Sequence, residues 1–168
     1  MLVLRCVVFV VFHGFSAALH AATPLPAPNG EVLLRVTGDI AEALQPEAAF
    51  DREMLAELGE RTIETTTPWT RGKQSFTGVP LHDLLDRLGV EDGTLRVIAL
   101  NDYAASVPVE DAVEDGPILA YARNGEEMTI RDKGPLWLIY PYDSDNNYRT
   151  ETIFARSVWQ VGHIEVDK

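Results

Sequence analysis

The sequence is almost devoid of cysteine, because Cys6 is the only one among its 168 residues. A disulfide requires two thiols, and iron–sulfur clusters and other soft-metal sites depend on thiolate ligands. Cys6 lies in a segment that we expect to be removed, so we predict that the working chain contains no thiol. This excludes disulfide cross-links, thiolate catalysis and sulfur-ligated metals.

Basic residues are also scarce, with 14 Lys and Arg against 26 Asp and Glu and a formal net charge of −12. Such a negative field repels phosphate backbones and anionic lipid surfaces, so nucleic-acid and anionic-membrane partners are disfavoured. The simplest interpretation of this acidity is solubility alone. A small anion can still bind where the few basic residues converge.

Several catalytic signatures are missing. The sequence contains no G-x-S-x-G motif, no phosphate loop and no dinucleotide fingerprint. Beyond residue 21 the only histidines are His82 and His163, which we expect on a helix and in a strand. Asp143, Asp145 and Asn147 have the spacing of part of a calcium loop but lack its glycine and distal glutamate. No metal site is therefore predicted.

The amino-terminal segment is organised like an export signal. One positive charge in residues 1–5 precedes an apolar run over residues 6–12, and small residues follow. The run is shorter than the roughly 20 residues needed to cross a membrane, although an uncleaved anchor is the alternative. We predict a signal peptide over residues 1–21, a Pro-rich spacer over 22–30 and a single domain over 31–168. The predicted location is the bacterial periplasm.

Apolar periodicity and turn residues predict an α+β domain with a mostly β core and two short helices. One helix begins at Asp51 and ends at Gly59, and the other covers residues 80–88, with Gly89 as its stop. Residues 109–115 are expected to form one helical turn with its acids on the solvated side. Asn124-Gly125 favours a hairpin, and Trp137 and Trp159 are expected within strands of the core. We expect strands over residues 31–38, 61–67, 94–100, 103–107, 117–123, 127–131, 136–140 and 157–166.

Four phrases support a family resemblance: FTGVPLHDLL at 76–85, NDY at 101–103, ILAYARNG at 118–125 and KGPLWLIYP at 133–141. Together with the order of the elements, they resemble the molybdopterin-binding domain of the sulfite oxidase family. The resemblance covers nearly the whole chain after the predicted signal peptide. It implies a sulfite-oxidase-type fold and, in catalytic members, molybdenum held by a pterin dithiolene and one cysteine thiolate.

The chain departs from this family pattern at two places. Counting back from Phe76 places Thr66 at the position of the family's cysteine, and a hard hydroxyl oxygen does not replace a soft thiolate. The stretch after Pro141 is basic and glycine-rich in the molybdenum enzymes, where it holds the cofactor's phosphate. Here it carries Asp143 and Asp145, which repel phosphate. The prediction is that no cofactor is bound, with molybdopterin as the alternative.

Residues near Thr66 have both functional and ordinary interpretations. The ring of Trp69 either covers a flat ligand or packs over the corner at Pro68. Arg71 and Lys73 either steer an anion or lie in a solvated loop. Residues 101–103 either hydrogen-bond a ligand or simply connect two strands.

Basic residues later in the chain are the remaining candidates. Arg131 and Lys133 bind an anionic head group or a partner's carboxylate, or else belong to a charged loop in which Asp132 pairs with its neighbours. Arg149 and Arg156 are potential anion contacts. The candidate ligand pocket comprises Thr66, Trp69, Arg71, Asn101, Asp102, Tyr103, Arg131, Lys133, Tyr142 and Arg156.

Two functional hypotheses follow. In the first, the chain is a periplasmic binding, sensing or interaction module that has lost molybdenum redox chemistry, and it recognises a small molecule or a membrane signalling protein. In the second, it is a molybdopterin-dependent oxidoreductase that exchanges electrons with a membrane or periplasmic partner. The first hypothesis accounts for both departures, whereas the second accounts only for the persistence of the scaffold.

Overall fold

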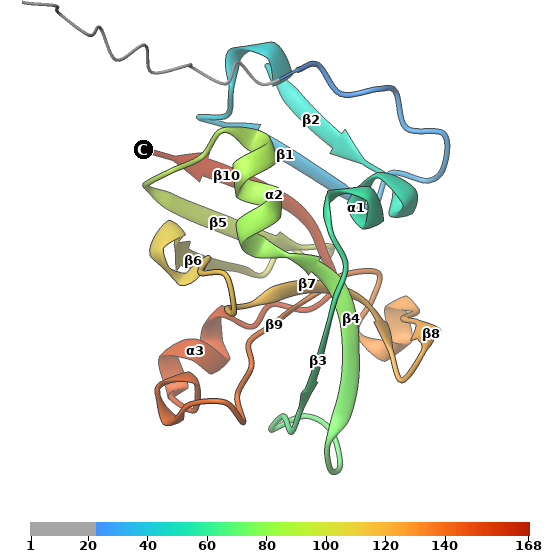
Figure 1. The fold of residues 1–168 in the computed structure, drawn as a ribbon, viewed down its shortest axis with the longest axis vertical. Helices are drawn as coiled ribbons and strands as arrows, with labels where there is room; N and C mark the ends of the chain where they lie inside the picture. Colours follow the sequence, from blue (N-terminus) through green and yellow to red (C-terminus); the bar gives the residue numbers. More distant parts are fainter. Residues whose placement is uncertain (1–22) are drawn as a thin grey trace, which may run out of the picture.

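The described part of the chain, residues 23–168 of this computed structural model, contains two five-stranded sheets (Figure 1). The predicted signal peptide and Cys6 lie outside the described residues. The described residues therefore contain no cysteine, and no helix among them is both long and apolar enough to cross a membrane.

The first sheet has the strand order β2-β1-β10-β5-β6, with the last strand of the chain at its centre. β1 and β10 run parallel, and the other neighbours are antiparallel. Every second side chain of β1 and β5 is buried, which gives the sheet one apolar face. The strands are β1 (Leu34–Gly38), β2 (Glu47–Phe50), β5 (Thr94–Ala99), β6 (Ala104–Pro108) and β10 (Val161–Asp167).

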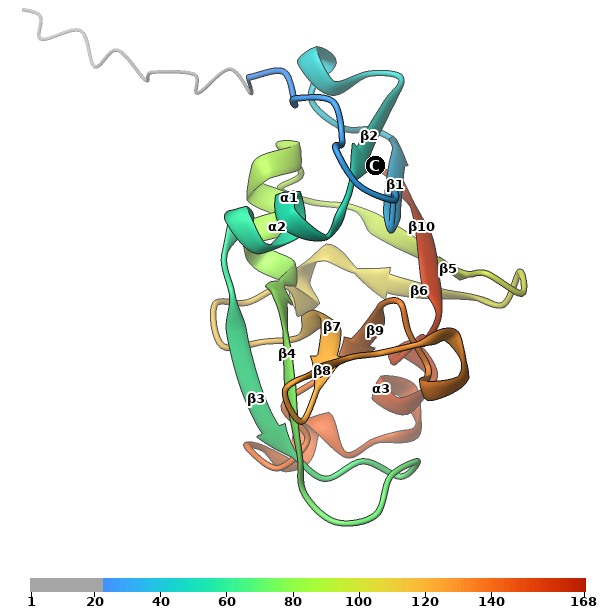
Figure 2. The same cartoon turned by 90° about the vertical axis from the view of Figure 1, so that its right-hand side faces the viewer.

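The second sheet is antiparallel throughout, and β7 pairs with β4, β8 and β9. Gly78 lets β4 approach β7 closely, since a Cβ atom there would lie 2.2 Å from the carbonyl oxygen of Leu119. The hairpin of β3 and β4 extends away from the first sheet (Figures 1 and 2). The strands are β3 (Arg61–Thr65), β4 (Gln74–Pro80), β7 (Ile118–Arg123), β8 (Glu126–Glu127) and β9 (Trp137–Ile139).

Two helices, α1 (Arg52–Leu58) and α2 (Leu81–Leu88), lie on the same side of the first sheet (Figure 2). The carboxylate of Asp51 caps α1 by accepting a hydrogen bond from the backbone N–H of Met54 at 2.9 Å. All four leucines of α2 are buried, and Gly89 ends that helix at φ 69°. Both helices and the α+β class are as predicted.

A third helix, α3 (Glu151–Arg156), corrects the prediction of two helices. Its six residues make fewer than two turns, which is too short for a periodic apolar pattern to be recognised. The side chain of Thr150 caps its start, and Ser157 closes its end through a backbone bond to Phe154. Single helical turns also occur at Glu42–Leu44, Val109–Asp111, Ile130–Asp132 and Asn146–Tyr148.

The predicted strands over residues 127–131 and 157–166 were both too long. After β8 the chain turns at residues 130–132, because the carbonyl of Thr129 accepts bonds from the N–H groups of Asp132 and Gly134. β10 begins only at Val161, so Trp159 lies outside the regular strands and is only partly buried. Trp137 lies in β9 and is fully buried, as predicted. β2 and β4 were not predicted.

Candidate functional site

A cavity of about 270 Å³ lies where the end of β5 and the β5–β6 corner face α3 and the segment that follows it. Trp69, from the loop after β3, completes its wall. We call it the aromatic cavity because four of its lining side chains are aromatic. It is lined by Trp69, Ala99, Asn101, Tyr103, Phe154, Ala155, Ser157, Val158 and Trp159.

Trp69 lies at the centre of the aromatic cluster beside this cavity. Its ring centroid is 5.6 Å from that of Trp159, 5.8 Å from that of Trp137, 5.9 Å from that of Phe154 and 6.4 Å from that of Tyr142. The interplanar angles of these pairs range from 58° to 81°, so none of the four rings is stacked flat on Trp69. Trp69 thus packs into an aromatic core and also borders the cavity.

Lys133 covers one face of Trp159, with its ammonium 3.7 Å from the ring centroid. Such cation–π contacts are attractive because the ring face carries partial negative charge. Burial, followed by the nearby Arg123, lowers the pKa of Lys133. The ammonium of Lys133 therefore faces the ring of Trp159, and Lys133 is not among the residues that line the aromatic cavity.

The corner at residues 101–103 forms the mouth of the cavity. The side-chain oxygen of Asn101 accepts a hydrogen bond from the backbone N–H of Tyr103 at 3.3 Å. Asp102 adopts φ 65°, a left-handed conformation that aspartate tolerates in turns. The Tyr103 hydroxyl reaches across and donates to the carbonyl oxygen of Ala155 at 3.2 Å, although 52% of the residue is exposed.

Tyr142 holds the segment after α3 in place through a hydrogen bond to Ser157. Its hydroxyl donates to the Ser157 hydroxyl at 2.7 Å, and Ser157 in turn donates to the carbonyl oxygen of Ile153 at 2.7 Å. Burial raises the pKa of Tyr142 to about 12. These bonds hold the segment after α3, and Tyr142 itself is not among the lining residues.

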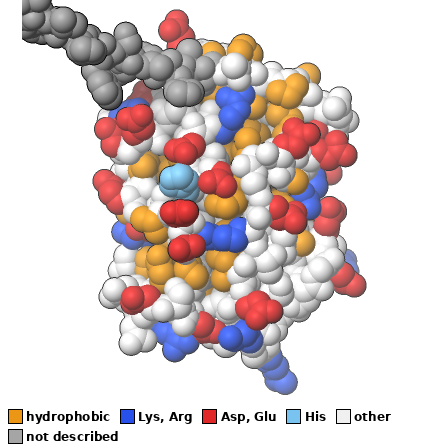
Figure 3. All heavy atoms as spheres, viewed as in Figure 1, with side chains coloured by type: hydrophobic (Ala, Val, Ile, Leu, Met, Phe, Trp, Pro, Cys, Tyr) orange, Lys and Arg blue, Asp and Glu red, His pale blue; other side chains and the backbone are white. Residues whose placement is uncertain are grey.

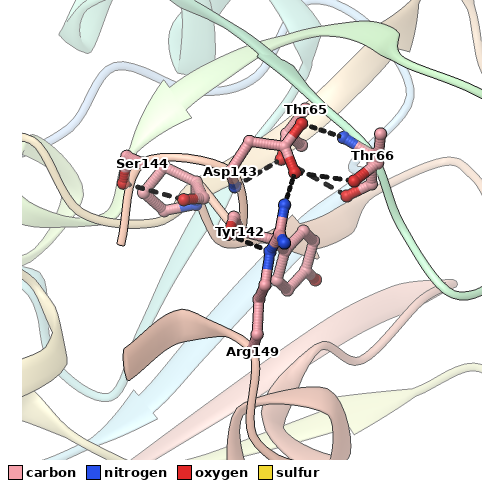
Figure 4. A network of polar contacts seen from close by, with 7 residues as sticks. Thr65, Thr66, Tyr142, Asp143, Ser144 and Arg149 are labelled. Carbon is pink, nitrogen blue, oxygen red and sulfur yellow. Dashed lines mark hydrogen bonds and ion pairs between the residues drawn. The ribbon is translucent and has the colours of Figure 1, made fainter. Parts of the chain in front are cut away.

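Thr66 is fixed by a carboxylate, as Figure 4 shows. Its backbone N–H donates to Asp143 at 2.8 Å and its hydroxyl donates to the other Asp143 oxygen at 2.6 Å. Arg149 also pairs with Asp143, and the backbone N–H of Asp143 donates to the Thr65 hydroxyl at 3.1 Å. We call these four residues the Thr66 corner. The bond from the Thr66 hydroxyl, with the other contacts, lowers the pKa of Asp143.

Arg156 forms an ion pair with Asp111 and is not among the residues that line the cavity. Its guanidinium lies 2.9 Å from an oxygen of Asp111, and the Tyr140 hydroxyl donates to the same carboxylate at 2.7 Å. Burial and this bond raise the pKa of Tyr140. The helical turn at residues 109–111 is as expected, but Asp111 faces this arginine and not only solvent. Arg156 is thus a structural partner rather than a free anion contact.

The remaining basic candidates stand apart from the aromatic cavity. Arg71 and Lys73 are exposed in the loop between β3 and β4, and Arg131 is exposed near β8. Acidic side chains are spread over the face drawn in Figure 3, with basic ones among them. Asp132 accepts a bond from Thr129 at 2.8 Å and lies 3.8 Å from Arg123, as the charged-loop interpretation holds.

The structure therefore brings only part of the predicted pocket together. Trp69, Asn101 and Tyr103 line the aromatic cavity, whereas Asp102, which lies between the last two in the sequence, is not among the lining residues. Thr66 lies in its own corner and is not among the lining residues. The sequence did not predict six of the lining residues: Ala99, Phe154, Ala155, Ser157, Val158 and Trp159. Among these six, the only sequence signal of a binding wall was the aromatic character of Phe154 and Trp159.

Fold and cavity together define a β-rich α+β domain of the sulfite oxidase type. A model of the oxidoreductase molybdopterin binding domain matches residues 49–147, and the chain belongs to this family. The resemblance inferred from the sequence phrases is thereby confirmed.

Two known proteins resemble parts of the chain. An uncharacterized oxidoreductase of Bacillus subtilis, YuiH, is 30% identical over 82 residues, which are 48% of this chain and 41% of that protein. The crystal structure of the sulfane dehydrogenase SoxCD from Paracoccus pantotrophus matches at a TM-score of 0.58 and 20% identity, covering 79% of this chain and 37% of that one. The chain thus spans about two fifths of the length of each relative.

The residues of the Thr66 corner do not fit a thiolate-held molybdenum. The side chain at the position inferred for the ligand is a hydroxyl, and its proton is donated to Asp143. No group of three or more metal-ligating His, Cys, Asp or Glu side chains occurs among residues 23–168. The carboxylate of Asp143 also adds negative charge to this corner, which disfavours a phosphate beside it.

Proposed function

We propose that this chain is an exported, periplasmic binding module that keeps the oxidoreductase-like molybdopterin-binding scaffold and works without molybdenum redox chemistry. One observation carries the proposal: the Thr66 hydroxyl and backbone N–H are both bonded to Asp143. The hydroxyl at this position donates its proton to a carboxylate, and its oxygen is a hard ligand atom that does not replace a soft thiolate.

The electrostatics of the Thr66 corner support the same proposal. Arg149 is the nearest basic side chain, and its charge is balanced by Asp143. An incoming phosphate would have to displace this carboxylate from three donors, two of them on Thr66. Hydrogen bonds to a charged group are among the stronger ones in proteins, so this displacement is unfavourable.

The aromatic cavity supplies a place for a ligand in this proposal. It has the concave, mostly apolar wall with few polar groups that is typical of small-molecule sites. We favour sensing or binding of a small molecule over contact with a membrane signalling protein, because a concave and mostly apolar wall of this size suits a small molecule. Export to the periplasm rests on the predicted signal peptide.

A molybdopterin-dependent oxidoreductase is the second candidate, favoured by family membership. The names of the two relatives, an oxidoreductase and a sulfane dehydrogenase, point the same way. In that case an oxygen ligand or an open position stands where the thiolate is expected, and electrons pass to or from a membrane or periplasmic partner.

The deciding experiment is elemental analysis and pterin fluorescence of protein purified from a host that makes the cofactor. We expect neither stoichiometric molybdenum nor pterin. Stoichiometric molybdenum with bound pterin would overturn the proposal and establish the second candidate.

A pair of cysteine variants sharpens this test. Thr66→Cys places a thiol at the position inferred for the ligand, while Thr62→Cys places one at an exposed position of β3, where the Thr62 hydroxyl is hydrogen-bonded to that of Thr77. We expect no molybdenum in either variant, because Asp143 still repels the phosphate. Molybdenum bound by Thr66→Cys alone would show that the phosphate site is intact and would contradict this part of the argument.

A further inference from the structure

We propose that the aromatic cavity binds an uncharged, flat heteroaromatic molecule of one or two rings that carries a hydrogen-bond acceptor at its edge. This inference rests on the proposed function, since it names the ligand class of that binding module. It follows from the size of the cavity, the arrangement of its rings and the placement of nearby charges.

The size of the cavity limits the ligand. Its volume is about 270 Å³. Cavities of roughly 150 Å³ accept benzene, and sites for drug-sized ligands span roughly 300–1,000 Å³. The cavity lies between these classes, which corresponds to a molecule of one or two fused rings.

The ring arrangement favours a flat molecule. Trp69, Phe154, Tyr103 and Trp159 all contribute to the wall. Trp69 meets Phe154 at 81° and Trp159 at 69°, so these rings pack edge to face and are not stacked flat on one another. An aromatic ligand gains offset or edge-to-face contacts with such side chains beyond the burial of its surface.

The charges around the cavity disfavour ions of either sign. None of its lining residues, all of them in the described part of the chain, carries a formal charge. The nearby guanidinium of Arg156 is paired with Asp111, so an anion finds no free arginine in the wall. A cation finds no carboxylate among the lining residues, since Asp102 belongs to the adjoining corner but not to the lining, and the Lys133 ammonium over Trp159 repels it.

Asn101 supplies directional recognition at the mouth. Its side-chain oxygen is used by the backbone N–H of Tyr103. Its amide nitrogen, a donor of two protons, makes no hydrogen bond with any described residue. Ser157 is less suited, because its hydroxyl both accepts from Tyr142 and donates to Ile153. The free amide therefore selects a ligand with a carbonyl oxygen or a ring nitrogen at its edge.

Calorimetric titration of the purified protein with four probes tests the ligand class. The probes are 2-quinolinone, indole, indole-3-acetate and tryptamine, which are respectively neutral with an acceptor, neutral without a strong one, anionic and cationic. We expect 2-quinolinone to bind roughly five- to tenfold more tightly than indole, which is the effect of one hydrogen bond. We expect both charged indoles to bind more weakly than indole.

Two substitutions in α3 locate the binding. Ala155→Phe adds a ring to the cavity wall, and Thr152→Phe adds the same ring to an exposed position of that helix that does not line the cavity. We expect the first to abolish 2-quinolinone binding and the second to leave it unchanged. If Ala155→Phe fails to fold, Asn101→Leu serves instead, and it should remove the preference for 2-quinolinone over indole.

The outcomes separate this inference from the proposed function. Tighter binding of a charged indole than of indole, no binding of either neutral probe, or binding that Ala155→Phe does not affect would overturn the inference. In each of these cases a protein purified without molybdenum leaves the proposed function in place. Stoichiometric molybdenum would instead overturn the proposed function.

Discussion

The Thr66 corner and the aromatic cavity belong to the same domain but differ in how far their polar groups are hydrogen-bonded within the chain. In the corner, one carboxylate accepts bonds from Thr66 and Arg149, so the donors of the corner are satisfied by the chain itself. In the cavity, rings meet at steep angles and the amide nitrogen of Asn101 has no hydrogen-bond partner among the described residues, although its oxygen accepts from Tyr103. The polar groups of the first region are thus paired within the chain, whereas the second region has an amide donor with no such partner.

Under the proposed function, this difference is the means by which one fold loses one kind of chemistry and keeps a binding site. A metal site depends on a few donor atoms of a given softness, and a single residue such as Thr66 changes that. An aromatic wall depends on many weak contacts spread over several elements, and it survives the loss of any single donor. The two regions are therefore expected to respond differently to substitution.

Trp69→Ala is expected to have the largest effect, on the aromatic side of the comparison. Trp69 contacts four other rings, and replacing a large aromatic side chain in a packed region by alanine costs about 3 kcal/mol of unfolding free energy. Urea unfolding followed by far-UV circular dichroism measures the loss. Tyr103→Ala, at an exposed cavity residue, is the control and should cost less than about 1 kcal/mol. Equal losses in the two variants would contradict the central place of Trp69.

Asp143→Asn tests the polar side of the comparison. It removes the charge that Thr66 and Arg149 bind, and we expect a loss of about 2 kcal/mol of unfolding free energy. Asp145→Asn, two residues away, is the matched control, because Asp145 only caps the turn at Asn147. A loss in the control as large as that in Asp143→Asn would show that the corner is not specially stabilised.

The pH dependence of stability gives a third test. The pKa of Asp143 is lower in the folded protein, chiefly because the Thr66 hydroxyl bonds its carboxylate. The unfolded chain therefore takes up the proton more readily, so this contribution is complete above the ordinary aspartate pKa and is lost as the pH falls through the folded value. We expect the wild type to lose more thermal stability than Asp143→Asn between about pH 6 and pH 3. A parallel loss in both proteins would exclude Asp143 as the cause.

Tyr103→Phe is expected to have the smallest effect on stability. Its hydroxyl makes one exposed hydrogen bond across the mouth, so the unfolding free energy should change by less than about 0.5 kcal/mol. Ligand exchange should become faster, because the bond to Ala155 no longer bridges the mouth. NMR line-shape analysis of 2-quinolinone measures this rate. An unchanged rate would show that the bridge does not control access.

The fold was predictable where local patterns are strong. The leucines of α2, the Asp51 cap and the Asn124-Gly125 hairpin each follow from residues close together in sequence, and all three are present. α3 was missed because six residues are too few for periodicity, and β10 was predicted to begin too early because the apolar residues Val158 and Trp159 belong to the cavity segment.

The candidate site was less predictable, because its contacts are distant in sequence. Thr66 and Asp143 are 77 residues apart, and Arg156 and Asp111 are 45 apart. No spacing rule joins such pairs, so sequence reasoning treated Arg156 as a free anion contact. It identified Asn101 and Tyr103, which lie in a recognisable phrase, and Trp69, which lies close to Thr66 in the sequence, but not Phe154, whose role depends on the position of α3.

The tryptophan cluster has a practical consequence for studying this protein. The chain contains three tryptophans, and Trp69, Trp137 and Trp159 all lie within 6.3 Å of one another, measured between ring centroids. At such distances excitation passes readily between the rings, so they emit as one group rather than as three independent fluorophores. The intrinsic emission of the chain therefore reports on a single place, the tryptophan group of which Trp69 and Trp159 line the aromatic cavity, and no label is needed to follow what enters that cavity.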